Sequence, residues 1–254
     1  MTWGTDEEQA IRRGRWVAWS PFLLTVIVLA GILAYGAGIY ADLPDPVPTH
    51  WGASGEPDAW DEKSFGSVFM GLFISAGTAA LMAVLALIAP AVAQPQKDPT
   101  PYQRYRQEGT TRAIVSVLGW VSALTALFVG YVSVTGWIAP DQLHMVVPLV
   151  LFMMGILAVI VLPFRSWERW ATHLAAAHGI HPSPEDLAED RLWLPGGIYN
   201  NPDDQLILVP KREGHGTGLT VNVGHRRGKT AVAVFVTVFV VAPIALVAVL
   251  STFG

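Results

Sequence analysis

The sequence contains no cysteine and few charged residues. Without cysteine, neither a disulfide framework nor a thiolate metal site can form. Charged residues make up 14% of the 254 residues, compared with about a quarter in a typical soluble domain. Hydrophobic residues make up 52%, and the formal net charge of −4 gives no support for nucleic-acid binding. This composition favours an integral membrane protein, with membrane lipid as its first partner.

The common catalytic and cofactor-binding motifs are missing as well. The chain has no His-Glu-x-x-His pattern, no Gly-x-Ser-x-Gly turn, and no phosphate-binding loop that ends in Gly-Lys-Ser or Gly-Lys-Thr. The stretch 214–218, Gly-His-Gly-Thr-Gly, precedes a predicted strand instead of a helix, so a hairpin turn explains its glycines better than a ligand loop. We therefore predict no catalytic residue, no metal ligand and no cofactor, and expect a protein that is not an enzyme.

Five long segments carry no Asp, Glu, Lys or Arg. Each is longer than the roughly 20 apolar residues that a helix needs to cross the hydrocarbon core of a membrane. None has an ionisable residue deep inside it, which argues against a proton relay and an ion-coupled transporter. The segments are residues 16–41, 64–96, 113–140, 142–164 and 230–254.

The basic residues lie almost entirely on one side of these segments. Fifteen of the sixteen Lys and Arg residues precede the first segment or lie in the second or fourth connection, and only Lys63 lies in the first. Positive charge stays on the cytoplasmic side, so we expect a cytoplasmic N-terminus and an extracytoplasmic C-terminus at Gly254 of a cell-membrane protein. The predicted parts are a cytoplasmic N-terminus (1–15), a first helix pair (16–92) with an extracytoplasmic loop (41–64), a cytoplasmic loop (93–112), a second helix pair (113–164), a cytoplasmic subdomain (165–229) and a fifth helix (230–254).

Small residues recur every four positions in the first three segments. Such stripes let helix backbones approach closely, which predicts a packed helical bundle; a pore lined by small residues is the alternative. In the fifth segment, Pro243 predicts a kink because proline removes an intrahelical hydrogen bond. The stripes are Ala30, Ala34 and Gly38, then Ser67, Gly71, Ser75, Ala79 and Ala83, then Ser122, Ala126 and Gly130.

The connection 165–229 is long enough to have a structure of its own. Residues 165–177 place two tryptophans on one helical face, which predicts a helix that continues the fourth segment or lies in the membrane interface. Ser183 followed by Pro184 and two acidic residues predicts an N-cap and a short helix. Residues 206–209 and 219–223 are strand-like and predict a small sheet that is stable only when docked.

The predicted outer loop, residues 41–64, is acidic and rich in proline. It holds six carboxylates and one lysine, and its four prolines restrict the backbone, so it can bind a cationic partner at a low entropic cost. A structural connector that packs on its own helices is the alternative. His50, Asp58 and Asp61 could also meet at a cation, but their loose spacing favours an ordered acidic loop. The candidate partner-binding residues are Asp45, Pro48, His50, Trp51, Gly55, Glu56, Asp58, Trp60 and Asp61.

Seven positions of this loop form a pattern: Leu43, Pro44, Pro48, His50, Gly55, Asp58 and Trp60. The pattern resembles the signature loop of a family of bacterial membrane proteins, an uncharacterised domain that also occurs at the front of the SdpI-type toxin-immunity and signalling proteins. The stretches 196–204, 209–212 and 219–222 look like a second uncharacterised bacterial module that often accompanies it. The resemblance implies a helix on either side of the loop and a role in immunity or signalling.

Together these features predict an all-α polytopic membrane protein with five transmembrane helices and a small mixed α/β cytoplasmic subdomain. We expect a receptor-like or immunity-like signalling factor whose outer loop recognises an extracytoplasmic peptide or an envelope partner. A transporter or permease subunit, with Pro148 and Pro243 as gates, is the first alternative, and an enzyme acting at the membrane interface is the second. An oligomer is an open option, and nucleic acid is not an expected partner.

Overall fold

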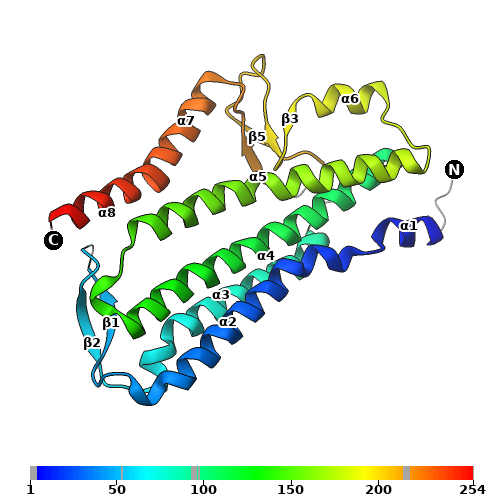
Figure 1. Cartoon of the computed structure of the whole chain (residues 1–254). Coiled ribbons are helices and arrows are strands. Elements are labelled where there is room, and N and C mark those ends of the chain that lie inside the picture. Colours follow the sequence, from blue (N-terminus) through cyan, green and yellow to red (C-terminus); the bar gives the residue numbers. More distant parts are fainter. Residues whose placement is uncertain (1–4, 53, 93–95, 97, 214–217, 254) are drawn as a thin grey trace. The chain divides into compact units, whose positions relative to one another are not determined.

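The computed structural model describes residues 5–52, 54–92, 96, 98–213 and 218–253 (Figure 1). The stretch 214–217, where the sequence predicts a hairpin turn, and Gly254 lie outside the described residues. The chain forms two compact units. Unit 1 contains Met1–Ser20, Val84–Leu118 and Ala158–Phe235, and unit 2 contains Pro21–Ala83, Gly119–Leu157 and Val236–Gly254.

Five helices in the described part of the chain are long and apolar enough to cross a membrane, which agrees with the predicted multi-pass membrane protein. The third is the most buried, because 44% of its most apolar stretch lies inside the protein, compared with 0% to 17% for the other four. The exposed apolar faces of those four suit contact with lipid. The five spans are Gln9–Asp42, Phe65–Ala91, Pro101–Ile138, Val146–Ala177 and Arg226–Leu250.

Two helices extend beyond the spans that hydropathy predicted. Helix α4 (Pro101–Ile138) begins well before residue 113, and α5 (Val146–Ala177) continues well past Phe164, the first of the two predicted alternatives. The added turns of α4 and α5 pack together with α1 (Thr5–Arg12) in a small hydrophobic core, so their apolar side chains contact protein. The buried residues of this core are Ile11, Tyr102, Tyr105, Ala171 and Ala175.

The core of unit 2 depends on a close approach of α2 (Ser20–Ile39) to α3 (Phe65–Val92) and α4. A Cβ atom on Gly36 of α2 would lie 2.6 Å from the Trp137 ring and 2.7 Å from the Phe69 ring. Phe69 is fully buried, and its ring meets the edge of Trp137 at a centroid distance of 5.5 Å. Glycine at position 36 therefore allows the aromatic side chains of the other two helices to fill the space.

The small-residue stripe predicted for α3 faces inward. Ser75 is 2% exposed, and a Cβ on Gly71 would lie 3.2 Å from Val129 of α4. The stripe predicted for α2 is exposed instead, because Gly36 and not that stripe lies on the inward face of this helix. The prediction was therefore wrong for Ala30, Ala34 and Gly38.

The fifth span contains a wide helical turn before its proline. Helix α7 (Arg226–Val236) continues through a π-helical turn, Thr237–Val241, into α8 (Ala242–Phe253). In a regular α-helix the ring of Pro243 would clash with the carbonyl group four residues earlier, and a wider turn relieves that clash. At the place where the sequence predicts a kink, the structure has this π-helical turn.

The connection between α5 and α7 forms a short helix and small antiparallel sheets. The capped helix predicted after Ser183 is present, and so is the predicted pairing of two late strands. An additional hairpin was not predicted, because its strands have only two residues each and give no period-two pattern. The elements are α6 (Pro184–Asp190), β3 (Trp193–Leu194), β4 (Ile198–Tyr199), β5 (Leu208–Pro210) and β6 (Leu219–Val221).

Asn222, directly after β6, satisfies the backbone of the neighbouring turns. Its fully buried side chain donates to the carbonyl oxygens of Asn201 at 2.8 Å and Leu206 at 3.2 Å. Its Oδ1 accepts from the amides of Asn201 and Gly224, both at 3.0 Å. Since buried backbone groups are costly when unpaired, this one side chain stabilises the irregular part of unit 1.

Candidate functional site

The predicted outer loop folds into a β-hairpin (Figure 1). Strand β1 (Val47–Trp51) pairs antiparallel with β2 (Pro57–Asp61), and the register shifts on both sides of His50. Gly55, in the turn, has a φ of +88°, which favours glycine. The loop is therefore an ordered structure that presents its side chains at fixed positions.

Two of the candidate residues anchor the hairpin to the segment between α4 and α5. The indole Nε1 of Trp51 donates to the carbonyl oxygen of Pro140 at 2.9 Å. A Cβ on Gly136 would lie 2.5 Å from the Trp51 ring, so only glycine lets the ring lie so close to α4. Gly55 contacts the carbonyl group of Leu143. Trp51 and Gly55 thus serve the structure of the hairpin.

Asp45 and Lys63 close the base of the hairpin. The Asp45 carboxylate accepts from the backbone amide of Lys63 at 2.9 Å. The Lys63 ammonium donates to the carbonyl oxygens of Leu43 at 2.8 Å and Ala41 at 3.4 Å. Asp45 therefore has a structural role at the base of the hairpin.

His50 and Asp58 form a cross-strand pair. The His50 Nδ1 atom lies 2.5 Å from Asp58 Oδ1, and the two side chains are 69% and 53% exposed. Asp61 does not join them: the described residues contain no cluster of three potential metal ligands. The pair therefore links the strands at a solvent-exposed position.

The outer surface of β2 remains open to solvent. Trp60 is 53% exposed although it lies opposite the half-buried Pro48. The sheet has two strands, so each strand also has an edge without a neighbour. Exposed carboxylates precede and follow the tryptophan along the chain. We refer to Glu56, Asp58, Trp60, Asp61 and Glu62 as the acidic face.

The nine candidate residues of the loop thus divide by position. Asp45, Trp51 and Gly55 hold the hairpin in place, and Pro48 and His50 lie in β1 against β2. The remaining four belong to the acidic face: Glu56, Asp58, Trp60 and Asp61. Chemically, this face offers negative charge beside one aromatic ring, which suits basic and apolar side chains.

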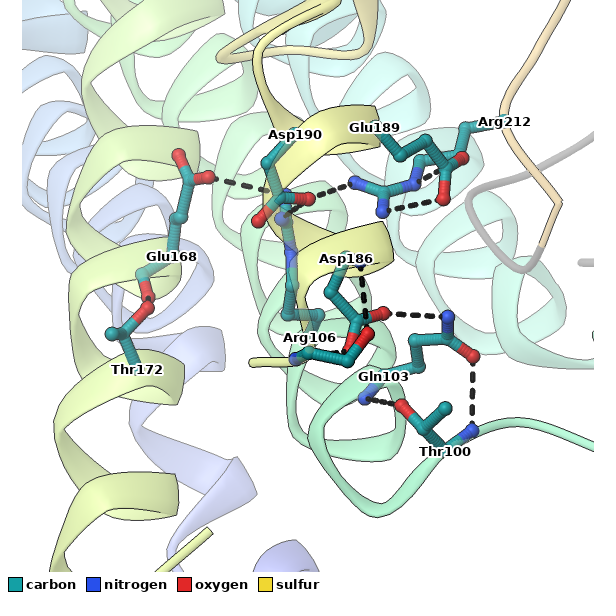
Figure 2. A network of polar contacts seen from close by, with 10 residues as sticks. Thr100, Gln103, Arg106, Glu168, Thr172, Asp186, Glu189, Asp190 and Arg212 are labelled. Atoms are coloured by element: carbon teal, nitrogen blue, oxygen red, sulfur yellow. Dashed lines mark hydrogen bonds and ion pairs between the residues drawn. The ribbon is translucent and has the colours of Figure 1, made fainter. Parts of the chain in front are cut away.

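A second polar group, within unit 1, joins α4, α5 and α6 (Figure 2). Arg106 pairs with Asp190, and its Nη2 lies 3.1 Å from Glu168. Asp190 also accepts from Arg212 at 2.7 Å, and Arg212 pairs with Glu189 at 2.9 Å. Two arginines and three carboxylates therefore form one connected network.

The two arginines of this network are mostly buried, with 10% and 5% of the Arg106 and Arg212 side chains exposed. Burial by itself lowers the pKa of Arg212, but its hydrogen bond to Asp190 and the charges of Glu189 and Asp190 outweigh burial and raise that pKa. Arg212 is therefore charged at every physiological pH. A buried cation of this kind is stable only beside its carboxylates.

Capping side chains connect α6 to the start of α4, as Figure 2 shows. Ser183 accepts from the amide of Asp186 at 3.1 Å, and Asp186 accepts from the amide of Ser183 at 3.0 Å. Asp186 also accepts from the Gln103 side chain at 2.8 Å. Gln103 in turn exchanges hydrogen bonds with Thr100 at the beginning of α4. The sequence predicts the N-cap at Ser183, but it does not predict the hydrogen bond between Asp186 and Gln103 of α4.

Another buried ion cluster fixes the segment before α2. Glu108 of α4 accepts from Arg15 and from Arg112, both at 2.9 Å. Arg112 also donates to the carbonyl oxygen of Ile11 at 3.0 Å, and its guanidinium carbon lies 3.9 Å from the centre of the Trp170 ring. These contacts tie three separate parts of unit 1 together.

Sequence patterns contain little sign of the polar network around Arg106. Its partners are far apart along the chain: 62 positions separate Arg106 from Glu168, and 22 separate Arg212 from Asp190. No helical or strand period relates residues at such distances. The one sequence signal for this network is the resemblance of the stretches 196–204 and 209–212 to a second bacterial module. The stretch 209–212 contains Arg212, which belongs to the network.

Residues 26–74 match the model of a domain of unknown function, DUF1648. The match spans most of α2, the whole hairpin and the start of α3, so it includes all nine candidate residues. It agrees with the uncharacterised domain that the loop pattern indicated. Comparisons with curated proteins and with solved structures gave no match.

Proposed function

We propose that this protein is a receptor-like or immunity-like membrane factor whose acidic face recognises a cationic extracytoplasmic peptide or envelope partner. The observation that carries the proposal is the contrast within one hairpin. Trp51 and Gly55 fix it from one side, while Trp60 and the carboxylates around it stay exposed. A surface that is ordered before binding loses little conformational entropy when a partner binds.

The charge of the hairpin supports a cationic partner. The one lysine of the loop, Lys63, directs its ammonium group to backbone carbonyl oxygens and not to the acidic face. Asp58 pairs with His50, and the other carboxylates of that face give it a negative potential, which speeds the encounter with a positively charged partner. Salt screens such attraction over roughly 8 to 10 Å.

The proposal includes the orientation that follows from charge. The hairpin would lie outside the cell, and the basic residues of unit 1 would lie in the cytoplasm. The likeness of the loop to the SdpI-type proteins supports a role in immunity or signalling, because the resembling residues are those of the hairpin itself. In this role the protein binds its partner and catalyses no reaction.

The test is the binding of a defined peptide to the purified protein in detergent. A fluorescent peptide of alternating lysine and valine should bind the parent protein and dissociate as ionic strength rises. Replacing three exposed carboxylates at once, with Glu56→Gln, Asp61→Asn and Glu62→Gln, should weaken binding roughly tenfold at low salt. Asp45 is left intact because its carboxylate holds the base of the hairpin.

Two controls separate recognition from general charge effects. A peptide with glutamate in place of lysine should not bind. A double variant of unit 1, Glu185→Gln with Asp203→Asn, removes exposed carboxylates elsewhere and should bind like the parent. If the triple variant keeps the parent's affinity and salt dependence, the hairpin is a structural connector and the proposal fails.

A further inference from the structure

The polar network of unit 1 borders a pocket that no sequence pattern indicates. Its volume is about 100 Å³, compared with the roughly 30 Å³ that one water molecule occupies in the liquid. The pocket can therefore hold a group of a few heavy atoms. Helices α4 and α5 and the turn between β3 and β4 surround it, and its lining includes Arg106, Thr110, Ile114, Phe164, Gly196 and Lys211.

Lys211 and Thr110 supply donors that the protein itself does not use. Neither side chain makes a hydrogen bond or an ion pair within the described part of the chain. Three lining residues are cationic, with Arg106 and Arg212 beside Lys211, and Glu168 is the acidic one among them. Because both arginines already have carboxylate partners, Lys211 is the cation with free capacity for an anionic group.

Part of the pocket lining is apolar and lies at the predicted membrane boundary. Ile114 is at the beginning of the third predicted span, and Phe164 is the last residue of the fourth. Trp193 and Leu194 add further apolar surface. A ligand that fits both the polar and the apolar part of the lining carries an anionic group next to a hydrocarbon part.

The neighbouring surface of α5 adds positive charge. Arg165 and Arg169 are exposed, and with Pro195 they line a groove that shares Glu168 with the pocket. Neither arginine forms an ion pair among the described residues. Clusters of basic residues next to membrane spans attract the anionic lipids of the cytoplasmic leaflet.

We infer that this pocket binds the phosphate group of an anionic phospholipid, with Lys211 and Thr110 as donors and the lipid chains directed along Ile114 and Phe164. A free phosphate ion presents the same anionic oxygens to Lys211. It gains nothing from the apolar part of the lining, which favours the lipid. The inference does not depend on recognition by the hairpin, because every residue involved belongs to unit 1.

Thermal unfolding of the delipidated protein in detergent tests this inference with three probes. Short-chain phosphatidylglycerol should raise the unfolding temperature, whereas phosphatidylcholine of the same chain length and inorganic phosphate should raise it far less. Lys211→Gln should increase the half-saturating concentration of phosphatidylglycerol about fivefold. Thr110→Val should weaken binding as well while it keeps the charge, and it provides a second variant if Lys211→Gln does not fold.

Lys229→Gln is the matched control, since Lys229 is an exposed lysine of unit 1 outside the pocket. It should leave the response to phosphatidylglycerol unchanged. An equal response to phosphatidylglycerol and phosphatidylcholine, or an equal loss in Lys229→Gln and Lys211→Gln, would overturn the inference. If inorganic phosphate alone reproduced the whole shift, the pocket would be a free-anion site and the lipid assignment would be wrong.

Discussion

Arg212 donates to Asp190 at 2.7 Å, and the same carboxylate oxygen pairs with Arg106. The Asp190 side chain at the end of α6 therefore compensates two guanidinium groups, that of Arg106 in α4 and that of Arg212, two residues after β5. Because both arginines are mostly buried, neither can exchange this partner fully for water. The position of α6 within unit 1 depends on this arrangement.

We predict that Asp190→Asn destabilises the protein by about 2–4 kcal/mol, because it leaves two buried cations with less compensation at an almost unchanged shape. Thermal or chemical unfolding in detergent measures the effect. The control is Glu185→Gln on the same helix, which removes an exposed carboxylate and should cost less than about 1 kcal/mol. Equal losses in the two variants would contradict the importance of the network.

The contribution of Arg212 to stability should not depend on pH between about 6 and about 9. Its folded pKa is raised, so its stabilisation is fully present below the unfolded pKa and is lost only as pH rises through the still higher folded pKa. Both values lie far above this range. The difference in unfolding temperature between the parent and Arg212→Gln should therefore be constant. A difference that disappeared within the window would show that another group controls the pairing.

A single methyl group at Gly36 should disturb the core of unit 2. The Cβ of Gly36→Ala would lie within 2.7 Å of two aromatic rings, so we expect a loss of about 1–3 kcal/mol in unfolding. Gly31 lies on the same helix, and a Cβ added there would have no neighbouring atom within 4 Å. Gly31→Ala should be neutral or slightly stabilising, since alanine favours helix. If both variants unfold alike, the close helix contact is not real.

Asn222→Ala should loosen the turns of unit 1 without affecting the membrane helices. It removes donors and acceptors that pair with the backbone of Asn201, Leu206 and Gly224, at about 1–3 kcal/mol for each unsatisfied buried group. Hydrogen exchange or limited proteolysis at residues 200–210 reports the change. Asn200→Ala is the matched control, because in the described structure its side chain makes no hydrogen bond. Equal protection in both variants would rule out the central role of Asn222.

Local signals in the sequence were enough for several elements. The five spans follow from long uncharged runs, because a helix in lipid needs a continuous apolar surface. The start of α6 follows from Ser183 and Pro184, whose capping chemistry depends only on adjacent residues. The pairing of β5 with β6 follows from two apolar runs separated by turn residues.

Features that depend on distant residues could not be predicted in the same way. The uncharged run of the third span begins at residue 113 because Glu108 and Arg112 are charged. In the fold these two residues pair with each other, and Arg112 lies against the ring of Trp170. Trp51 carried no sign that it would dock near Pro140, a contact between positions 89 residues apart. The candidate loop was found, but the separation of its anchors from its exposed face required the structure.

The proposed function places the hairpin outside the cell and the basic residues of unit 1 in the cytoplasm. The chain has no cysteine, so single cysteines can be placed at Ser54 in the hairpin turn and at Gln205 in an exposed loop of unit 1. Ser183 is unsuitable because its side chain caps α6. In intact cells, a membrane-impermeant thiol reagent should label Ser54→Cys and should label Gln205→Cys only after permeabilisation. Labelling of Gln205→Cys in intact cells, with Ser54→Cys protected, would contradict the account.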